Sequence, residues 1–434
     1  MANVTNREEI LVNSIAAIQN NTAYDPVNMP WINQVGVTRT SESYSRFEGR
    51  FSFGPNNEFW DSAVDVNGTR TYLPNELGVN LTLGTASGDK YYDISSQIFF
   101  YQPDTVVHAA TAILFEPQTD VRKLWGFASW DGGTGQIKDG FILRAEGRTI
   151  QFVRISSASG SIVTHTLDRA DWYDPLDGSG PSGVNLDFTK VQMAKIDFAW
   201  YGAGTARLYF RLGGKEYLAA RFDGSNIRTE PITGNPNLST IYGIENLAAV
   251  GSTPNFKHWG LSVSVDGKKE ETGRRFGVGV DAVTVSGGAW VPLLSIRLKS
   301  SFSIDGADAK ANTLGYLTEI VASISCSSRD ARVAIIRNSV LTGASWGNIP
   351  DVTGAGIAAS MVEFDTTASA FTGGIPVYIK SISSGSETKF EVYKDELISF
   401  NSLGDTTPII TIAARPLAGG NGDVSGSLSW KEVY

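Results

Sequence analysis

Apolar and polar residues alternate one by one along most of this chain, a pattern that indicates β-strands with one buried face. The alternation is clearest over residues 195–200 and 207–212, which flank a Gly-Ala-Gly turn at 202–204. These two stretches together predict a β-hairpin. One face of the hairpin is apolar, and the other, which carries Asp197 and Arg207, is polar. We therefore expect the second face to be the one turned away from the core.

The same alternation recurs in short stretches that are separated by clusters of Gly and Ser. Many short strands without helices between them predict a mainly β protein of tandem antiparallel β-sandwich or jelly-roll domains. The polar run 266–275 indicates a domain boundary, with one sandwich over 41–265 and a C-terminal sandwich over 276–434. The other strand candidates are 215–222, 261–265, 294–298, 332–337, 377–382, 389–393, 409–414 and 427–433.

Residues 1–40 form a different kind of segment, because only here does the apolar period approach 3.6. Asn6 and Glu9 have the spacing of a capping box, and the pair Asn20 and Asn21 marks the end of a short helix. The predicted helix and the arm after it form an attachment segment. Its apolar side is a candidate assembly face made of Ile10, Leu11, Ile15 and Ile18.

Composition narrows the classes of function. The 434 residues are 41% hydrophobic and carry a formal net charge of −9, with basic residues scattered along the chain. A globular fold is therefore favoured over a disordered chain, and nucleic acid is not expected as a partner. No apolar run of eighteen residues occurs, so membrane insertion is not expected. The single Cys326 has no partner for an internal disulfide and is predicted to be a small buried hydrophobe.

Catalytic and metal-binding patterns are weak in this sequence. Its three histidines are widely spaced, and no nucleophile elbow or phosphate-binding loop occurs. The Asp-rich segment 174–180 could bind calcium, but acidic residues beside Gly and Pro are usually turn formers, and turn chemistry alone explains the segment. We predict no enzyme, no cofactor and no metal. The alternative is a carbohydrate-active enzyme, a capsule or lipopolysaccharide depolymerase or a glycosidase, which would use carboxylates such as Glu146 and Asp177.

Aromatic residues are numerous, with ten Trp, fifteen Tyr and twenty-one Phe. In a β-rich protein most of these are expected in the core. Three tryptophans lie beside turns rich in Gly or Asp, where binding residues carried by loops tend to occur. They are candidate glycan contacts: Trp125, Trp130 and Trp172.

Two long motifs resemble a block found in structural proteins of tailed bacteriophages, including marine and cyanobacterial phages. The first begins at Trp130 with WDGGTGQIKDGFILRAEG, and the second covers 171–190 with DWYDPLDGSGPSGVNLDFTK. The hairpin IDFAWYGAGTARLYF over 196–210 follows, then FDGSN at 222–226 and YGIEN at 242–246. The C-terminal half matches more loosely, through 292–299, 341–344, 362–365, 372–374 and 429–432.

This resemblance covers about 127–434, and it implies a virion structural protein. Such a protein would be a tail or head fibre, a baseplate element or a capsid decoration, assembled in the host cytoplasm. It would act through protein-protein interfaces with other virion proteins, as a homo-oligomer and most often a trimer. Host attachment through a surface polysaccharide is a variant of this function. The resemblance brings no catalytic residues.

Overall fold

The structure is a computed structural model, and it describes residues 43–103, 105–266, 273–304, 307–310, 315–350, 360–393, 397–417 and 420–434. Within these ranges the regular elements are β-strands and two short 3-10 helices. The strands form antiparallel sheets, so the predicted mainly β fold of sandwich domains is confirmed. The predicted N-terminal helix and domain segment 1–40 lie outside the described residues. The described part of the chain contains no helix long and apolar enough to cross a membrane.

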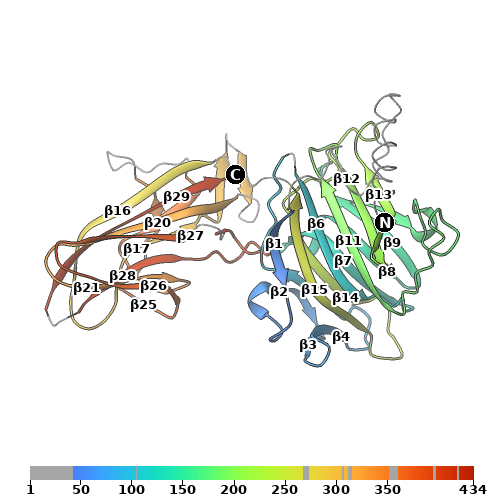
Figure 1. Cartoon of the computed structure of the whole chain (residues 1–434), viewed down its shortest axis with the longest axis horizontal. Helices are drawn as coiled ribbons and strands as arrows, with labels where there is room; N and C mark the ends of the chain where they lie inside the picture. The colour runs from blue at the N-terminus through green and yellow to red at the C-terminus, as the bar shows by residue number, and fades with distance from the viewer. Residues whose placement is uncertain are drawn as a thin grey trace, which may run out of the picture.

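Residues 43–266 form a first sandwich of two large sheets (Figure 1). The eight-stranded sheet has the order β13-β12-β11-β6-β15-β4-β3, with β1 also paired to β15, and the seven-stranded sheet has the order β10-β9-β8-β7-β14-β5-β2. The elements are β1 (Ser43–Gly49), η2 (Asn57–Phe59), β2 (Trp60–Val66), β3 (Gly68–Leu73), β4 (Gly78–Leu83), β5 (Lys90–Ser95), β6 (Val106–Leu114), β7 (Val121–Asp131), β8 (Gln136–Glu146), β9 (Thr149–Ser156), β10 (Val163–Asp168), η3 (Arg169–Asp171), β11 (Val191–Ala199), β12 (Thr205–Leu212), β13 (Lys215–Asp223), β14 (Ser239–Asn246) and β15 (Asn255–Asp266).

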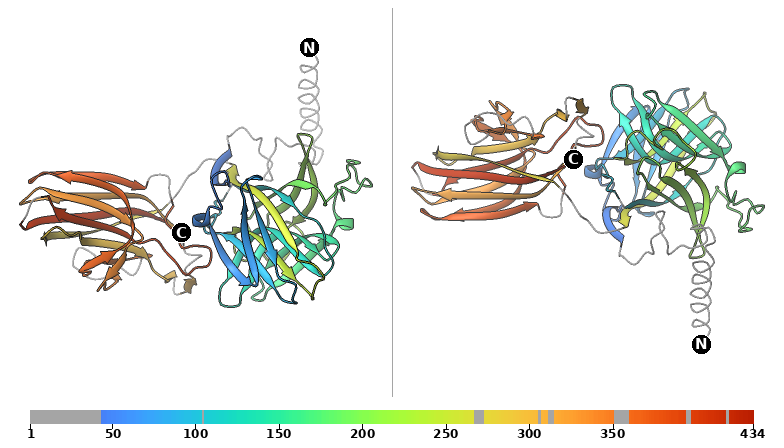
Figure 2. Two further views of the ribbon diagram at one scale, coloured as in Figure 1. Left: turned by 90° about the horizontal axis from the view of Figure 1, so that it is seen from below. Right: turned by 90° about the horizontal axis from the view of Figure 1, so that it is seen from above.

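Residues 274–433 form a second set of sheets, which Figure 2 shows beside the first sandwich. A four-stranded sheet has the order β16-β29-β20-β27, and a six-stranded sheet has the order β23-β24-β17-β28-β21-β26. Two small hairpins, β18-β19 and β22-β25, accompany them. The strands are β16 (Arg274–Val285), β17 (Val291–Leu298), β18 (Ser301–Ile304), β19 (Ala307–Lys310), β20 (Tyr316–Cys326), β21 (Ala331–Arg337), β22 (Val340–Thr342), β23 (Gly347–Asn348), β24 (Val362–Asp365), β25 (Ala370–Thr372), β26 (Ile375–Ile382), β27 (Glu387–Tyr393), β28 (Ile410–Pro416) and β29 (Gly422–Val433).

Period-two alternation determines which side chains enter each core. On β7 the side chains of Trp125 and Phe127 point between the two sheets and are fully buried. Phe198 on β11 meets Phe127 from the opposite sheet, edge to face, with ring centroids 5.0 Å apart. The predicted hairpin is confirmed, because β11 pairs with β12 from Met193 to Ala199. In the second sandwich Cys326 is buried as predicted, and burial raises the pKa of its thiol.

One ion pair links the two layers of the first sandwich. The Arg70 Nε on β3 donates to Asp93 Oδ2 on β5 at 2.7 Å, and both side chains are almost completely buried. Burial disfavours the charged carboxylate more strongly than Arg70 favours it, and it raises the pKa of Asp93 to about 7.

This raised pKa predicts a pH dependence of stability. A carboxyl whose folded pKa is raised contributes stability below its unfolded pKa of 3.8, and that contribution is lost as pH rises toward 7. We expect the free energy of unfolding of the chain to fall over this range by at most about 1.4 kcal/mol per pH unit from this group. The variant Asp93→Asn should remove that slope. Urea unfolding of both proteins between pH 4 and 8 checks this, and equal slopes would contradict it.

Candidate binding cleft

A continuous polar network crosses the outer face of the seven-stranded sheet. The Arg122 side chain on β7 donates from Nη1 to Glu245 Oε2 at 2.7 Å and from Nε to Glu146 Oε2 at 2.9 Å. The Tyr92 hydroxyl donates to the same Glu245 oxygen at 2.9 Å, and Arg144 Nε lies 3.3 Å from Glu146 Oε2. These five residues come from β5, β14, β7 and β8, which are neighbours in the sheet. The network is therefore held in place by four paired strands.

The network extends to the edge of the sheet. Arg144 Nε donates to Gln151 Oε1 at 2.8 Å, and Gln151 Nε2 donates to Asp168 Oδ1 at 2.8 Å. Burial raises the pKa of the Tyr92 phenol far above its usual range, so this hydroxyl keeps its proton and remains a donor. Chains of hydrogen bonds of this kind strengthen one another where water is partly excluded.

Beside this network lies a cleft of about 360 Å³. Its floor is aliphatic, because alternate positions on three adjacent strands are Leu124 on β7, Ile142 on β8 and Val153 on β9. The volume is at the lower end of what small-ligand sites usually have, and an apolar floor with a few fixed polar groups is their usual character. The other lining residues are Lys90, Tyr92, Arg122, Gly135, Gln136, Ile137, Arg144, Ile155, Ile162, Thr164 and Glu245.

A loop of the second sandwich covers part of the same outer face of the seven-stranded sheet, around Trp130. Leu403, in the connection between β27 and β28, packs on the apolar cluster that includes Trp130 and the cleft floor. The preceding residue, Ser402, is buried, and its backbone N–H donates to the Ser96 carbonyl at 3.1 Å. Its hydroxyl lies 2.5 Å from the Ser239 hydroxyl and also donates to the Ser95 carbonyl. The second sandwich is thus anchored beside the cleft.

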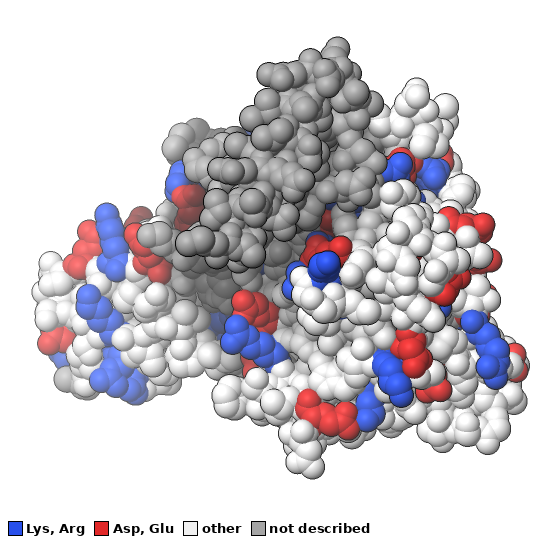
Figure 3. Space-filling view, turned by 45° about the vertical axis from the view of Figure 1, so that its right-hand side comes forward, with Lys and Arg blue, Asp and Glu red and all other residues white. Residues whose placement is uncertain are grey.

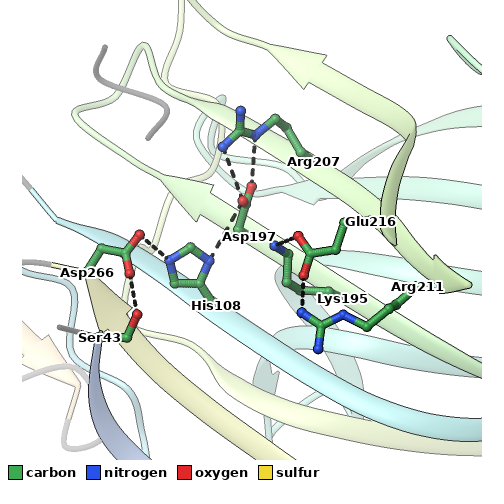
Figure 4. Close-up of polar contacts among 8 residues, drawn as sticks. All are labelled: Ser43, His108, Lys195, Asp197, Arg207, Arg211, Glu216 and Asp266. Carbon is green, nitrogen blue, oxygen red and sulfur yellow. Dashed lines mark hydrogen bonds and ion pairs between the residues drawn. The ribbon is translucent and has the colours of Figure 1, made fainter. Parts of the chain in front are cut away.

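The outer face of the eight-stranded sheet carries a second polar cluster, shown in Figure 4. Arg207 binds Asp197 through two hydrogen bonds, of 3.0 Å and 3.2 Å. His108 lies between two carboxylates, with Nε2 2.8 Å from Asp266 Oδ2 and Nδ1 3.7 Å from Asp197 Oδ2. Ser43 Oγ donates to Asp266 Oδ1 at 2.8 Å. All four charged side chains are at most 8% exposed.

The polar face of the hairpin is turned away from the core, as predicted, but in this cluster it is not open to solvent. Asp197 and Arg207 are as buried as the apolar residues on the other face of the same strands. Although burial opposes ionisation, Arg207 holds the pKa of the Asp197 carboxyl below its usual range. The next pairs along the strands are more exposed: Lys195 and Arg211 both bind Glu216 at 2.5 Å. A ligand would have to break ion pairs to use these groups, so the cluster fits a structural role better than a binding one.

The three tryptophans proposed as glycan contacts are not exposed, and that prediction was wrong. Trp125 is fully buried between the two sheets, and Trp130 and Trp172 are each 4% exposed. Trp130 lies on the outer face, but Tyr92 and Leu403 pack on it. The Trp172 ring stacks on Phe210, and its Nε1 donates to the Leu167 carbonyl. A tryptophan beside a turn is therefore still buried when its side chain points into a core or is covered by neighbouring residues.

The acidic residues of the alternative enzyme hypothesis do not come together. Glu146 belongs to the cleft network, whereas Asp177 is an exposed turn residue that accepts hydrogen bonds from Ser179. In the same loop, Asp174 accepts the backbone N–H groups of Leu176 and Ser182, which is turn chemistry. Among the described residues, no three His, Cys, Asp or Glu side chains converge on a metal-sized site. The candidate assembly face of Ile10, Leu11, Ile15 and Ile18 lies outside the described residues.

Sequence reasoning missed the groups that define the cleft. Arg122 and Glu146 are cross-strand partners on β7 and β8, so the hairpin pairing could have brought them together. Glu245 and Tyr92 come from distant strands, and only the sheet order places them beside Arg122. Nothing in the local sequence around either residue signals that meeting.

No protein-family model and no curated protein matches the chain. Among solved structures, a β-glucanase of Bacillus licheniformis is 14% identical with a TM-score of 0.32, over 52% of this chain and 98% of its own. A Crh5 transglycosylase in complex with NAG is 10% identical with a TM-score of 0.35, over 52% and 88% of the two chains. A lectin from Bauhinia forficata in complex with GalNAc is 12% identical with a TM-score of 0.29, over 52% and 98%. The likeness concerns the β-sandwich fold and not an activity.

Proposed function

We propose that this chain is a non-enzymatic structural component of a tailed-bacteriophage particle, a fibre, baseplate or decoration protein that acts through protein-protein interfaces. The observation that carries the proposal is the sequence block from Trp130 to Phe210, which resembles such proteins. In the structure this block supplies the end of β7, the strands β8, β9, β10 and β11, most of β12 and the loop around Asp174. The block is therefore part of the rigid frame of the first sandwich, which is the kind of scaffold that a particle protein needs.

The link between the sandwiches supports the same proposal. Ile398 exchanges two backbone hydrogen bonds with Leu317 in the second sandwich, of 3.0 Å and 2.8 Å. A few residues later, Ser402 is buried against the first sandwich, and Asn401 Nδ2 reaches Asp61 Oδ2 at 3.4 Å. A short segment fixed at both ends limits the motion of one sandwich against the other. Rigid spacing of this kind suits a subunit that carries load between neighbours.

Basic and acidic side chains are interspersed on one face of the molecule. On the face shown in Figure 3, Lys and Arg side chains of the described residues lie next to Asp and Glu. This distribution is typical of a soluble surface and does not form a field for a polyanion. It supports partners that are proteins or saccharides over nucleic acid.

We infer a second function, binding of a host-surface saccharide, from the cleft on the seven-stranded sheet. The fixed Arg122 network beside an aliphatic floor is a prepared ligand site. The carboxylates there, Glu146 and Glu245, are both bound to Arg122 instead of flanking an open position in the cleft. A glycosidase of the usual kind needs two carboxyl groups that flank the scissile bond. Binding without cleavage is therefore the proposal.

Self-association tests the structural role. We expect the full-length chain to be a trimer by light scattering, and a chain lacking residues 1–36 to be a monomer, because the candidate assembly face lies in that segment. Serine at Ile10, Leu11, Ile15 and Ile18 should have the same effect within the full chain. A monomer in every case would instead favour a subunit that assembles only on the particle.

Hydrolysis assays test the enzyme alternative. We expect no new reducing ends when the chain is incubated with capsule or lipopolysaccharide of its host. Cleavage that is lost in the variant Glu146→Gln but kept in Asp223→Asn, a matched acidic residue on the other sheet, would contradict the proposal.

A further inference from the structure

The cleft contains polar groups that its own network leaves available. Lys90 lines the cleft, and within the described part of the chain its ammonium makes no hydrogen bond or ion pair. The same is true of the side chains of Gln136 and Thr164 on the opposite side, both of which are exposed. By contrast, Arg122 and Glu245 are already paired. A ligand would meet one unpaired cation on one side and two neutral hydrogen-bonding groups on the other.

The charge balance of the cleft favours an anion. Three lining residues are cationic, Lys90, Arg122 and Arg144, and one, Glu245, is anionic. Glu146, which contacts both arginines, adds a second negative charge. Both arginines are thus bound by carboxylates, and Lys90 is the cation of the cleft lining that no carboxylate of the described residues binds.

The apolar floor of the cleft determines which kind of ligand surface can pack on it. Leu124, Ile142 and Val153 present a flat aliphatic surface, and Ile162, which is 41% exposed, stands at its rim. A ligand needs a flat face of C–H groups to cover such a surface. Hydroxyls around the edge of that ligand would contact Gln136 and Thr164. The lining runs from Lys90 on β5 to Thr164 on β10, several strands away, so a chain of linked rings with C–H faces, hydroxyls and carboxylates satisfies all three parts of the cleft.

We propose that this cleft binds a segment of an acidic polysaccharide, with a sugar carboxylate at Lys90 and the hydroxyls of neighbouring sugar residues at Gln136 and Thr164. This inference rests on the host-saccharide binding proposed above and narrows it from saccharides in general to uronate-type saccharides. A carboxylate bound to an ammonium forms a charge-assisted hydrogen bond, which is stronger than a neutral one. A neutral sugar of the same shape would lose that contact and leave Lys90 desolvated without a partner.

Calorimetric titration of the full-length chain with tetragalacturonate tests the proposal, with the methyl ester of the same tetrasaccharide as the neutral probe. We expect the acid to bind and the ester to bind at least about tenfold more weakly. The variant Lys90→Gln should weaken binding of the acid by about tenfold or more. The acid and the ester should then bind this variant with equal affinity. Thr164→Trp, at an exposed position on an edge strand, should fill the cleft and abolish binding.

The variant Lys215→Gln is the matched control, because it removes the same charge from an exposed turn of the other sheet. It should bind the acid as the unaltered chain does. Equal binding of acid and ester, or binding that is unchanged in both cleft variants, would overturn the assignment. So would a poly-glutamate peptide that binds as tightly as the sugar acid. A chain that assembles as a trimer but binds no acidic saccharide at millimolar concentration would refute this inference and leave the structural role standing.

Discussion

Replacing Asp197 by alanine is expected to lower the free energy of unfolding by about 3 to 5 kcal/mol. The Asp197 carboxylate is fully buried and accepts two hydrogen bonds from Arg207, whose side chain is 5% exposed. Without the carboxylate, the Arg207 guanidinium remains in the same buried position with no equivalent anion, and His108 loses one of its two acidic neighbours. Most of the expected cost comes from that unpaired buried charge. Urea unfolding at pH 7 measures it.

The matched control is Asp223→Ala on β13, two strands away in the same sheet. Asp223 pairs with Arg221 at 3.0 Å, but both side chains are about one-third exposed or more. A surface pair of this kind contributes less than about 1 kcal/mol. Equal losses in the two variants would contradict the structural role assigned to the buried cluster.

The Asp197 variant also has a defined pH signature. Because the folded pKa of Asp197 is depressed, its contribution is present above the unfolded pKa of 3.8 and is lost as pH falls through the lower folded pKa. The difference in stability between the unaltered chain and Asp197→Ala should therefore be constant near neutrality. It should shrink in acid well below pH 4.

Replacing Trp430 by alanine is expected to destabilise the second sandwich by about 3 to 5 kcal/mol. The Trp430 ring is fully buried, and its Nε1 donates to Glu432 Oε1 at 3.0 Å. The buried Glu432 carboxylate also accepts hydrogen bonds from the Ser360 hydroxyl at 2.6 Å and the Met361 backbone N–H at 3.0 Å. The variant would therefore create a cavity and remove one of three donors from a buried carboxylate.

The variant Trp346→Ala serves as its control. The Trp346 ring is partly exposed and contacts the Arg297 guanidinium at 4.1 Å from the ring centroid. Its loss should cost about 1 kcal/mol, the size of an exposed cation–π contact. A Trp430 variant no less stable than the Trp346 variant in thermal unfolding would contradict the placement of the core.

Period-two alternation was enough to predict the strands and the antiparallel character of the fold, because each strand has one face in a core. It was not enough to say what covers the other face. Asp197 and Arg207 lie on a face that the sequence marks as polar, yet they are buried because each satisfies the charge of the other. The local sequence cannot distinguish a strand face whose polar side chains are exposed to water from one whose polar side chains are ion-paired and buried.

The candidate site depended on long-range pairing, which the sequence alone does not give. Glu245 and Arg122 meet because β14 pairs with β7. Ser402 reaches Ser96 and Ser239 from the other sandwich, although Ser402 and Ser239 are 163 positions apart in the chain. The three tryptophans were wrongly predicted as ligand contacts for a different reason. The sequence shows that they lie beside turns, but it does not show in which direction their rings point.

The most direct test of the proposed function is quantitative mass spectrometry of gradient-purified virus particles from a culture in which this chain is produced. We predict that the chain is recovered with the particles at a fixed copy number, a multiple of three, and stays with them through high-salt washing. Recovery only in the soluble lysate, with none in washed particles, would contradict a structural role in the virion.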